Sequence, residues 1–99
     1  MKPLFIPLKG EYYDAFADGS KTWEYRPYGP RWNERTCSMG REVVLSRGYG
    51  KAHRLRGKVV AFTKSQDMTQ TELWQSIYGQ KHTHAACIAV AVQPGCSNE

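Results

Sequence analysis

Hydrophobic and polar residues follow one another in short segments that predict five strands and two helices. We expect strands over residues 4–8, 21–26, 42–46, 55–63 and 85–92. We expect one helix over residues 11–17, and a second that runs from a cap at Thr69 or Thr71 to about Tyr78. The order β-α-β-β-β-α-β predicts an α+β fold that is mainly β, a small mixed barrel of about five to six strands flanked by two short helices.

The composition of single strands predicts where they lie in the sheet. Pro3 and Pro7 cannot donate ladder hydrogen bonds, so the strand 4–8 belongs at an edge. The near-continuous apolar run AACIAVAV over residues 85–92 predicts a strand that is buried on both faces and closes the barrel. In the fourth strand, Gly57 marks a bulge or bend, which a small barrel needs.

The second helix carries two local patterns. Leu73 and Ile77, with Trp74, form the stripe that we expect to be buried. The spacing Thr69-x-x-Glu72 matches a capping box, which gives Glu72 a structural role ahead of a catalytic one.

The candidate chemistry is concentrated in the segment KTWEYR, residues 21–26. Strand alternation places Glu24 and Arg26 on one face, and Lys21 lies at its mouth. A carboxylate beside two cationic donors can bind a polar ring or a phosphate, or it can move a proton. The same residues also fit a solvated surface ion pair, worth less than about 1 kcal/mol. If the three residues instead line a cleft, Lys21 and Glu24 are candidate catalytic residues and Arg26 is a candidate ligand contact.

The chain has 99 residues and a net charge of +5, and its positive charge is concentrated in one segment. Residues 21–58 hold ten Lys and Arg against three acids, a net charge of +7, whereas the rest of the chain sums to −2. Seven of the ten are arginine, which grips phosphates and stacks on bases. This clustering favours a polyanionic partner, nucleic acid first, over charge that serves only solubility.

Two loops in this basic segment offer further candidate contacts. The Pro- and Gly-rich loop after the second strand contains Arg31 and Trp32, a mixture that suits single-stranded nucleic acid and equally suits a loop packed on its own core. In the following loop, Arg47, Tyr49 and Lys51 alternate, and two glycines would let a ligand approach the backbone. A hairpin loop with solvated charges is the alternative for this second loop.

Cysteine and histidine spacing predicts neither a metal site nor a cofactor. Cys37, Cys87 and Cys96 form no C-x-x-C pair, and Cys87 falls in an apolar strand, where it is a small core residue. His82 and His84 could ligate a metal from one strand, but no third ligand accompanies them.

The central segment resembles the signature of the ASCH domain family. The pattern G-x-K-T-x-E-x-R over residues 19–26 follows a short helix that carries Tyr13 and Phe16, and Gly40 precedes the third strand as it does in ASCH-like chains. The resemblance extends over most of the chain, from residue 3 to residue 93. It implies a PUA-like barrel and a link to RNA.

The resemblance implies a binding function first. We expect an RNA- or nucleotide-binding domain with a basic cleft around Lys21, Glu24 and Arg26, between the barrel and the first helix. The partner would be nucleic acid, RNA rather than DNA, or a modified nucleoside.

The resemblance also implies a hydrolase as the alternative, because the chain is similar to the small acetylcytidine amidohydrolases of this family. In those enzymes a lysine, a threonine and a glutamate carry the chemistry; here Lys21, Glu24 and Gln66 fall on these positions. Glutamine cannot act as a general base, and Asp67 is adjacent but shifted by one residue. Lys21 would then be the nucleophile or base, with Glu24 moving the proton.

Metal-free cleavage of RNA is a third option. The acids and bases available for it are His53, Tyr49, Lys51 and Lys21.

The sequence predicts one domain over residues 1–93 and a flexible tail over residues 94–99. Its apolar runs are all shorter than the roughly 20 residues of a membrane-spanning helix, and the N-terminus is too short and too rich in proline for a signal peptide. We expect a cytoplasmic protein, in a bacterium or a phage-infected cell, that is monomeric and has no membrane partner.

Overall fold

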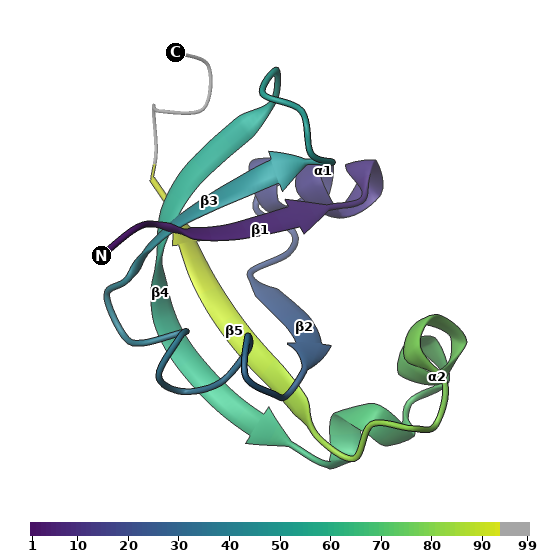
Figure 1. The fold of residues 1–99 in the computed structure, drawn as a ribbon. Helices are drawn as coiled ribbons and strands as arrows, with labels where there is room; N and C mark the ends of the chain where they lie inside the picture. The colour runs from purple at the N-terminus through teal and green to yellow at the C-terminus, as the bar shows by residue number, and fades with distance from the viewer. Residues whose placement is uncertain (94–99) are drawn as a thin grey trace.

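The computed structural model describes residues 1–93, and its elements follow the predicted order (Figure 1). The strands are β1 (Leu4–Leu8), β2 (Trp23–Pro27), β3 (Glu42–Arg47), β4 (Arg54–Ser65) and β5 (Ala85–Val92). The helices are α1 (Gly10–Asp18), α2 (Glu72–Tyr78) and a short 3-10 helix (Asp67–Gln70) that precedes α2. The predicted tail at 94–99, with Cys96, lies outside the described residues.

The five strands form one curled sheet in the order β1-β3-β4-β5-β2, a half-barrel that confirms the predicted α+β fold (Figure 1). β1 is parallel to β3, and the other three pairs are antiparallel. β1 lies at an edge, as its prolines predict. β5 does not close the barrel, because it lies between β4 and β2; within residues 1–93 the edge strands β1 and β2 do not pair with each other.

The inner face of the half-barrel holds the larger of two hydrophobic clusters. The bulkiest fully buried side chains in it are Ile6, Leu45, Leu55 and Ile88, from four different strands. Helix α1 adds Tyr13 and Phe16 to this cluster. The loop between β2 and β3 adds Trp32 and Cys37.

β5 is buried on both faces over most of its length, as predicted. Ile88 belongs to the cluster inside the half-barrel, whereas Ala85 and Cys87 point to the other face and pack with Trp74 of α2. Helix α2 therefore covers the outer face of the sheet at the end formed by β5 and β2.

Gly57 has a different role from the predicted one. The bulge in β4 lies between Val59 and Ala61, not at the glycine. A Cβ at Gly57 would stand 2.5 Å from the backbone oxygen of Ala91 and 3.0 Å from a methyl of Val90. Glycine is needed there because β5 passes too close to β4 for any side chain.

Of the stripe predicted to be buried on α2, only Trp74 is buried. Trp74 is 3% exposed, whereas Leu73 is 64% and Ile77 is 45% exposed. A helix of seven residues contacts the sheet along a single stripe, and Trp74 and Tyr78, four residues apart, occupy it. Leu73 and Ile77, also four residues apart, form a second stripe that faces away from the core.

The start of α2 also differs from the capping-box prediction. Thr71 is the N-cap, and its hydroxyl accepts a hydrogen bond from the backbone N–H of Trp74 at 3.2 Å. Thr69 lies buried in the preceding 3-10 helix, so it cannot cap α2 and the predicted box with Glu72 is wrong.

Candidate ligand-binding site

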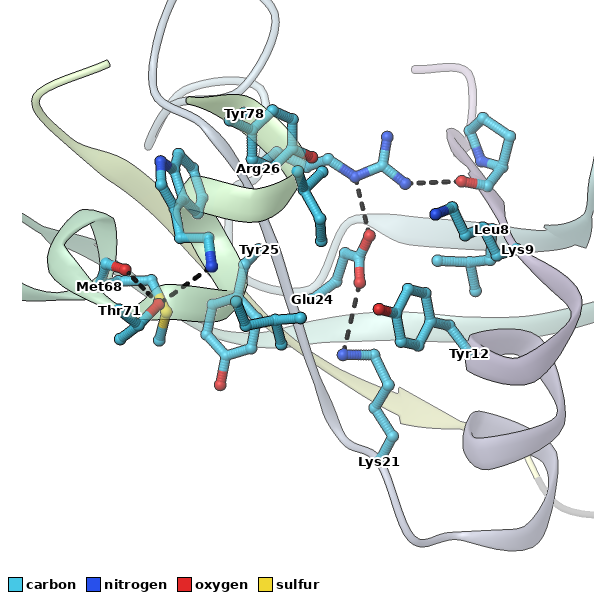
Figure 2. A pocket seen from close by; sticks show the side chains of 14 residues that line it. Leu8, Lys9, Tyr12, Lys21, Glu24, Tyr25, Arg26, Met68, Thr71 and Tyr78 are labelled. Atoms are coloured by element: carbon cyan, nitrogen blue, oxygen red, sulfur yellow. Dashed lines mark hydrogen bonds and ion pairs between the residues drawn. The ribbon is translucent and has the colours of Figure 1, made fainter. Parts of the chain in front are cut away.

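A cavity of about 460 Å³ lies where the end of β1, the start of α1, β2 and α2 meet (Figure 2). This volume is in the range of sites that bind small molecules. The cavity lies beside the first helix and over the second strand, where the sequence predicts a cleft, and α2 forms a further wall that the sequence did not predict. Its aromatic lining consists of Tyr12, Tyr25, Trp74 and Tyr78, and its aliphatic lining of Pro7, Leu8, Met68, Leu73 and Ile77.

The floor of the cavity carries a buried carboxylate between two cations (Figure 2). Glu24 is 7% exposed. Its Oε1 lies 3.5 Å from Nζ of Lys21, and its Oε2 accepts a hydrogen bond from Nε of Arg26 at 2.8 Å. Each carboxylate oxygen has two acceptor positions, so Glu24 keeps acceptor capacity for a ligand, and the cluster has one excess positive charge.

Lys21 reaches Glu24 from outside the strand. β2 begins two residues after Lys21, whose backbone N–H donates to the carbonyl of Ala15 in α1 at 3.1 Å. Its Nζ lies 5.2 to 5.5 Å from the ring centroids of three aromatic residues, Tyr12, Phe16 and Tyr25. Lys21 is therefore held between aromatic faces and the Glu24 carboxylate, where its Nζ can donate to a ligand.

Arg26 connects the two edges of the half-barrel. Its Nη2 donates to the backbone oxygen of Pro7 in β1 at 2.6 Å, while its Nε holds Glu24 (Figure 2). Its Cζ lies 5.1 Å from the ring centroid of Trp32, and Cζ of Arg31 lies at the same distance from that ring. Trp32 is 7% exposed and belongs to the main core, which supports the packing alternative for its loop.

Two tyrosines in the cavity wall have raised pKa values. Burial raises the pKa of Tyr78, Arg26 opposes the rise, and Glu24 adds to it. Burial also raises the pKa of Tyr25, with smaller contributions from Cys87 and Glu24. Both phenols are therefore protonated at neutral pH and offer O–H donors to a ligand.

The structure places the candidates of the β3–β4 loop outside the cavity. Arg47 ends β3 and lies 3.4 Å from a carboxylate oxygen of Asp14 in α1. Tyr49 is 80% exposed, and Lys51 and His53 are exposed in the turn before β4. Of the four groups considered for RNA cleavage, only Lys21 lines the cavity, because the hairpin carries the others away from β2.

Gln66 and Asp67 do not join Lys21 and Glu24 either. Both are exposed where the 3-10 helix begins, and neither lines the cavity. The 3-10 helix instead brings Met68 to the cavity wall, because consecutive residues of a helix point in different directions. The set of three residues implied by the amidohydrolase resemblance is therefore not assembled.

A scan against models of protein families gives no match, and a search of curated proteins gives no significant match.

In residues 1–93, no helix is long and apolar enough to cross a membrane. The same described part contains no group of three or more His, Cys, Asp and Glu side chains that could hold a metal ion. His82 packs against Trp74, with ring centroids 6.4 Å apart and the rings perpendicular.

Sequence reasoning missed the wall that α2 contributes. Leu73 and Ile77 were expected in the core, but they line the cavity while remaining exposed. The sequence does contain a signal for this wall. A seven-residue helix with four large apolar or aromatic side chains carries more apolar surface than one buried stripe can cover. Trp74 adds a feature that no sequence pattern shows, since its buried indole N–H has no hydrogen-bond partner within the described residues.

Proposed function

We propose that this chain is a nucleic-acid-binding module whose cavity accepts a single base or nucleoside, from RNA rather than DNA. The observation that carries the proposal is the buried Glu24 carboxylate, held by two cations on the floor of a cavity with aromatic walls. A planar heterocycle has the matching properties, because its faces are apolar and its edge carries donors and acceptors.

The cavity offers a partner for each part of a nucleoside. Tyrosine rings from α1, β2 and α2 can stack on a base, an interaction worth about 1–3 kcal/mol for each base. Glu24 can accept hydrogen bonds from an amino group or a ring N–H, as carboxylates do with cytosine. Lys21 and Arg26 can donate to a base carbonyl or to a phosphate.

The assignment to an ASCH-like domain is part of the proposal. It is supported by the motif at residues 19–26, whose lysine, glutamate and arginine all reach one cavity, and by the order of strands and helices. A PUA-like domain that binds RNA would use such a cavity for an unstacked base.

An NMR titration with the four ribonucleosides and a short single-stranded RNA tests the proposal. We expect shifts of amides in β2 and at the start of α2, and we expect Glu24→Gln to weaken binding of amino-bearing bases about tenfold or more. Lys81→Ala, an exposed lysine that does not line the cavity, is the matched control and should bind normally. Absence of shifts in β2 and α2 with every nucleoside and with RNA would contradict the proposal.

A hydrolase is the second candidate, because the Lys21 and Glu24 side chains lie 3.5 Å apart within the cavity. In this candidate Glu24 would accept a proton from Lys21, whose amine would then act as the nucleophile or base. Assays of acetylcytidine hydrolysis and RNA cleavage with Lys21→Ala separate the candidates. Turnover that requires Lys21 would make the protein an enzyme, and absence of turnover in the unchanged protein would leave only binding.

A further inference from the structure

We infer that the outer face of β1, β3 and β4 is a second binding surface, which holds the backbone and unpaired bases of a single-stranded nucleic acid. We call it the outer basic face; its residues are Phe5, Tyr49, Arg54, Arg56 and Lys58. Successive side chains of a strand point to opposite faces, and the residues between these in β1 and β4 face the core. This surface does not depend on the cavity function, since none of its five residues lines the cavity.

The aromatic part of the outer basic face is held in place by its neighbours. Tyr49 is 80% exposed, and its ring centroid lies 6.4 Å from that of Phe5. The guanidinium carbon of Arg54 lies 5.2 Å from the Phe5 ring centroid. Arg54 Nε and the Ser46 hydroxyl both donate to the backbone oxygen of Gly50, at 3.3 and 3.1 Å, which fixes the turn that carries Tyr49. The exposed ring is therefore available for stacking without a large ordering cost.

The basic part follows one strand. Arg54, Arg56 and Lys58 alternate along β4, so their side chains emerge on one face about 7 Å apart, on the scale of successive phosphates in an extended strand. Val44 of β3 is the register partner of both Arg56 and Phe5, which places the charges beside the aromatic pair. None of these three cations forms an ion pair with an acid of residues 1–93.

Charge and aromatic content together select the partner. Glu42, the register partner of Lys58, is an acid on this face, and no ion pair joins the two within the described chain. Three unpaired cations attract a polyanion, and an exposed ring beside them stacks only on bases that are not paired in a duplex. In Figure 1 the turn between β3 and β4 lies at one end of β4, and α2 follows the other end. The outer basic face therefore lies toward the end of β4 that is far from the α2 wall of the cavity.

The test measures binding of a labelled ten-nucleotide poly-uridine by fluorescence anisotropy, over a series of salt concentrations. For the double variant Arg56→Gln/Lys58→Gln we expect the negative slope of log affinity against log salt to become shallower by about 1.4, because each lost phosphate contact on a single strand removes about 0.7 from its magnitude. For Tyr49→Ala we expect a loss of affinity of about tenfold with an unchanged slope. Lys81→Gln is the control for charge alone, and it should change neither quantity by much.

Each outcome decides the inference separately from the cavity proposal. Loss of poly-uridine binding in the outer-face variants, with nucleoside binding to the cavity unchanged, supports binding at the outer basic face. This inference is overturned if poly-uridine does not bind at low salt, or if the outer-face variants bind poly-uridine as well as the unchanged protein does. Equal affinity for poly-glutamate, or for a duplex of the same length, would also overturn it, since neither offers bases for stacking. Failure of nucleoside binding alone would reject the cavity proposal and leave this inference standing.

Discussion

At the residue scale, Glu24 lies between two cations, Lys21 just ahead of β2 and Arg26 within β2. The two cationic side chains are still 20% and 17% exposed, so water screens part of the attraction. We predict that Glu24→Gln lowers the free energy of unfolding by about 2 kcal/mol, because a neutral amide cannot balance the two charges. Urea unfolding followed by tryptophan fluorescence measures this loss.

A surface glutamate provides the control for this prediction. Glu42 is exposed at the start of β3, and no ion pair joins it to another described residue. Glu42→Gln should change stability by less than about 0.5 kcal/mol. Equal unfolding midpoints for Glu24→Gln and Glu42→Gln would show that the cluster on the cavity floor does not stabilise the fold.

Tyr78 provides a second residue-scale prediction, in alkaline solution. Its pKa in the folded protein is raised, chiefly by burial, so the folded state keeps the phenol proton to a higher pH than the unfolded chain does. This contribution to stability is present in full below the usual tyrosine pKa of about 10 and is lost as the pH rises through the folded-state pKa. We predict that Tyr78→Phe loses stability less steeply above pH ~10 than the unchanged protein.

Urea unfolding at a series of alkaline pH values measures this effect. Tyr13 and Tyr25 also have pKa values raised by burial, so the variant should keep part of the slope. Parallel curves for the variant and the unchanged protein would contradict the assignment of the raised pKa to Tyr78.

At the element scale, the contact between β4 and β5 depends on Gly57. Its missing side chain leaves room for the backbone of Ala91, which a Cβ would approach to 2.5 Å. We predict that Gly57→Ala costs about 2 kcal/mol of stability, because backbone atoms cannot give way as a flexible side chain can. Thermal unfolding of Gly57→Ala, compared with Gly29→Ala, where a Cβ meets nothing within 4 Å, measures the cost of the collision. A similar melting temperature for both variants would contradict the predicted collision between a side chain at residue 57 and β5.

Elements whose signals are local were predicted well from the sequence. Proline identified the edge strand, and the apolar run at 85–92 identified the strand with two buried faces, because both properties depend on neighbouring residues alone. The buried stripe of α2 was predicted correctly at Trp74 and wrongly at Leu73 and Ile77. Leu73 and Trp74 are both apolar, and only the position of β5 and β2 decides which of them meets the sheet.

At the scale of the whole molecule, the contrast between local signals and contacts of distant elements also explains which parts of the candidate site could be predicted. Lys21, Glu24 and Arg26 lie within six residues of one another, so their proximity was predictable from the sequence. Tyr12 and Tyr78 reach the cavity from elements distant along the chain, and their approach follows from the curl of the sheet. The outer basic face likewise joins residues of β1 and β4, which are not neighbours in the sheet.

Within residues 1–93, the side chain of Arg26 connects the two edge strands of the half-barrel. Arg26 of β2 donates from Nη2 to the backbone oxygen of Pro7 in β1, while its Nε donates to Glu24. Lysine lacks the fixed fork of the guanidinium group and cannot make both contacts in this geometry. We predict that Arg26→Lys speeds amide hydrogen exchange in β2 about tenfold, because losing a hydrogen bond of a charged group removes about 1.5 kcal/mol from the local opening energy. Exchange in β3 and in the first half of β4, far from this contact, should stay unchanged.

Arg56→Lys is the matched control for this experiment, since Arg56 lies on the outer face of β4 and contacts neither edge strand through a hydrogen bond of the described residues. If Arg26→Lys speeds exchange in β2 alone, the side chain holds the edge strands together and keeps the cavity floor in shape for a ligand. If exchange rises equally in all five strands, Arg26 instead supports global stability. If it does not rise at all, the Arg26 hydrogen bonds do not contribute to holding the edge strands together.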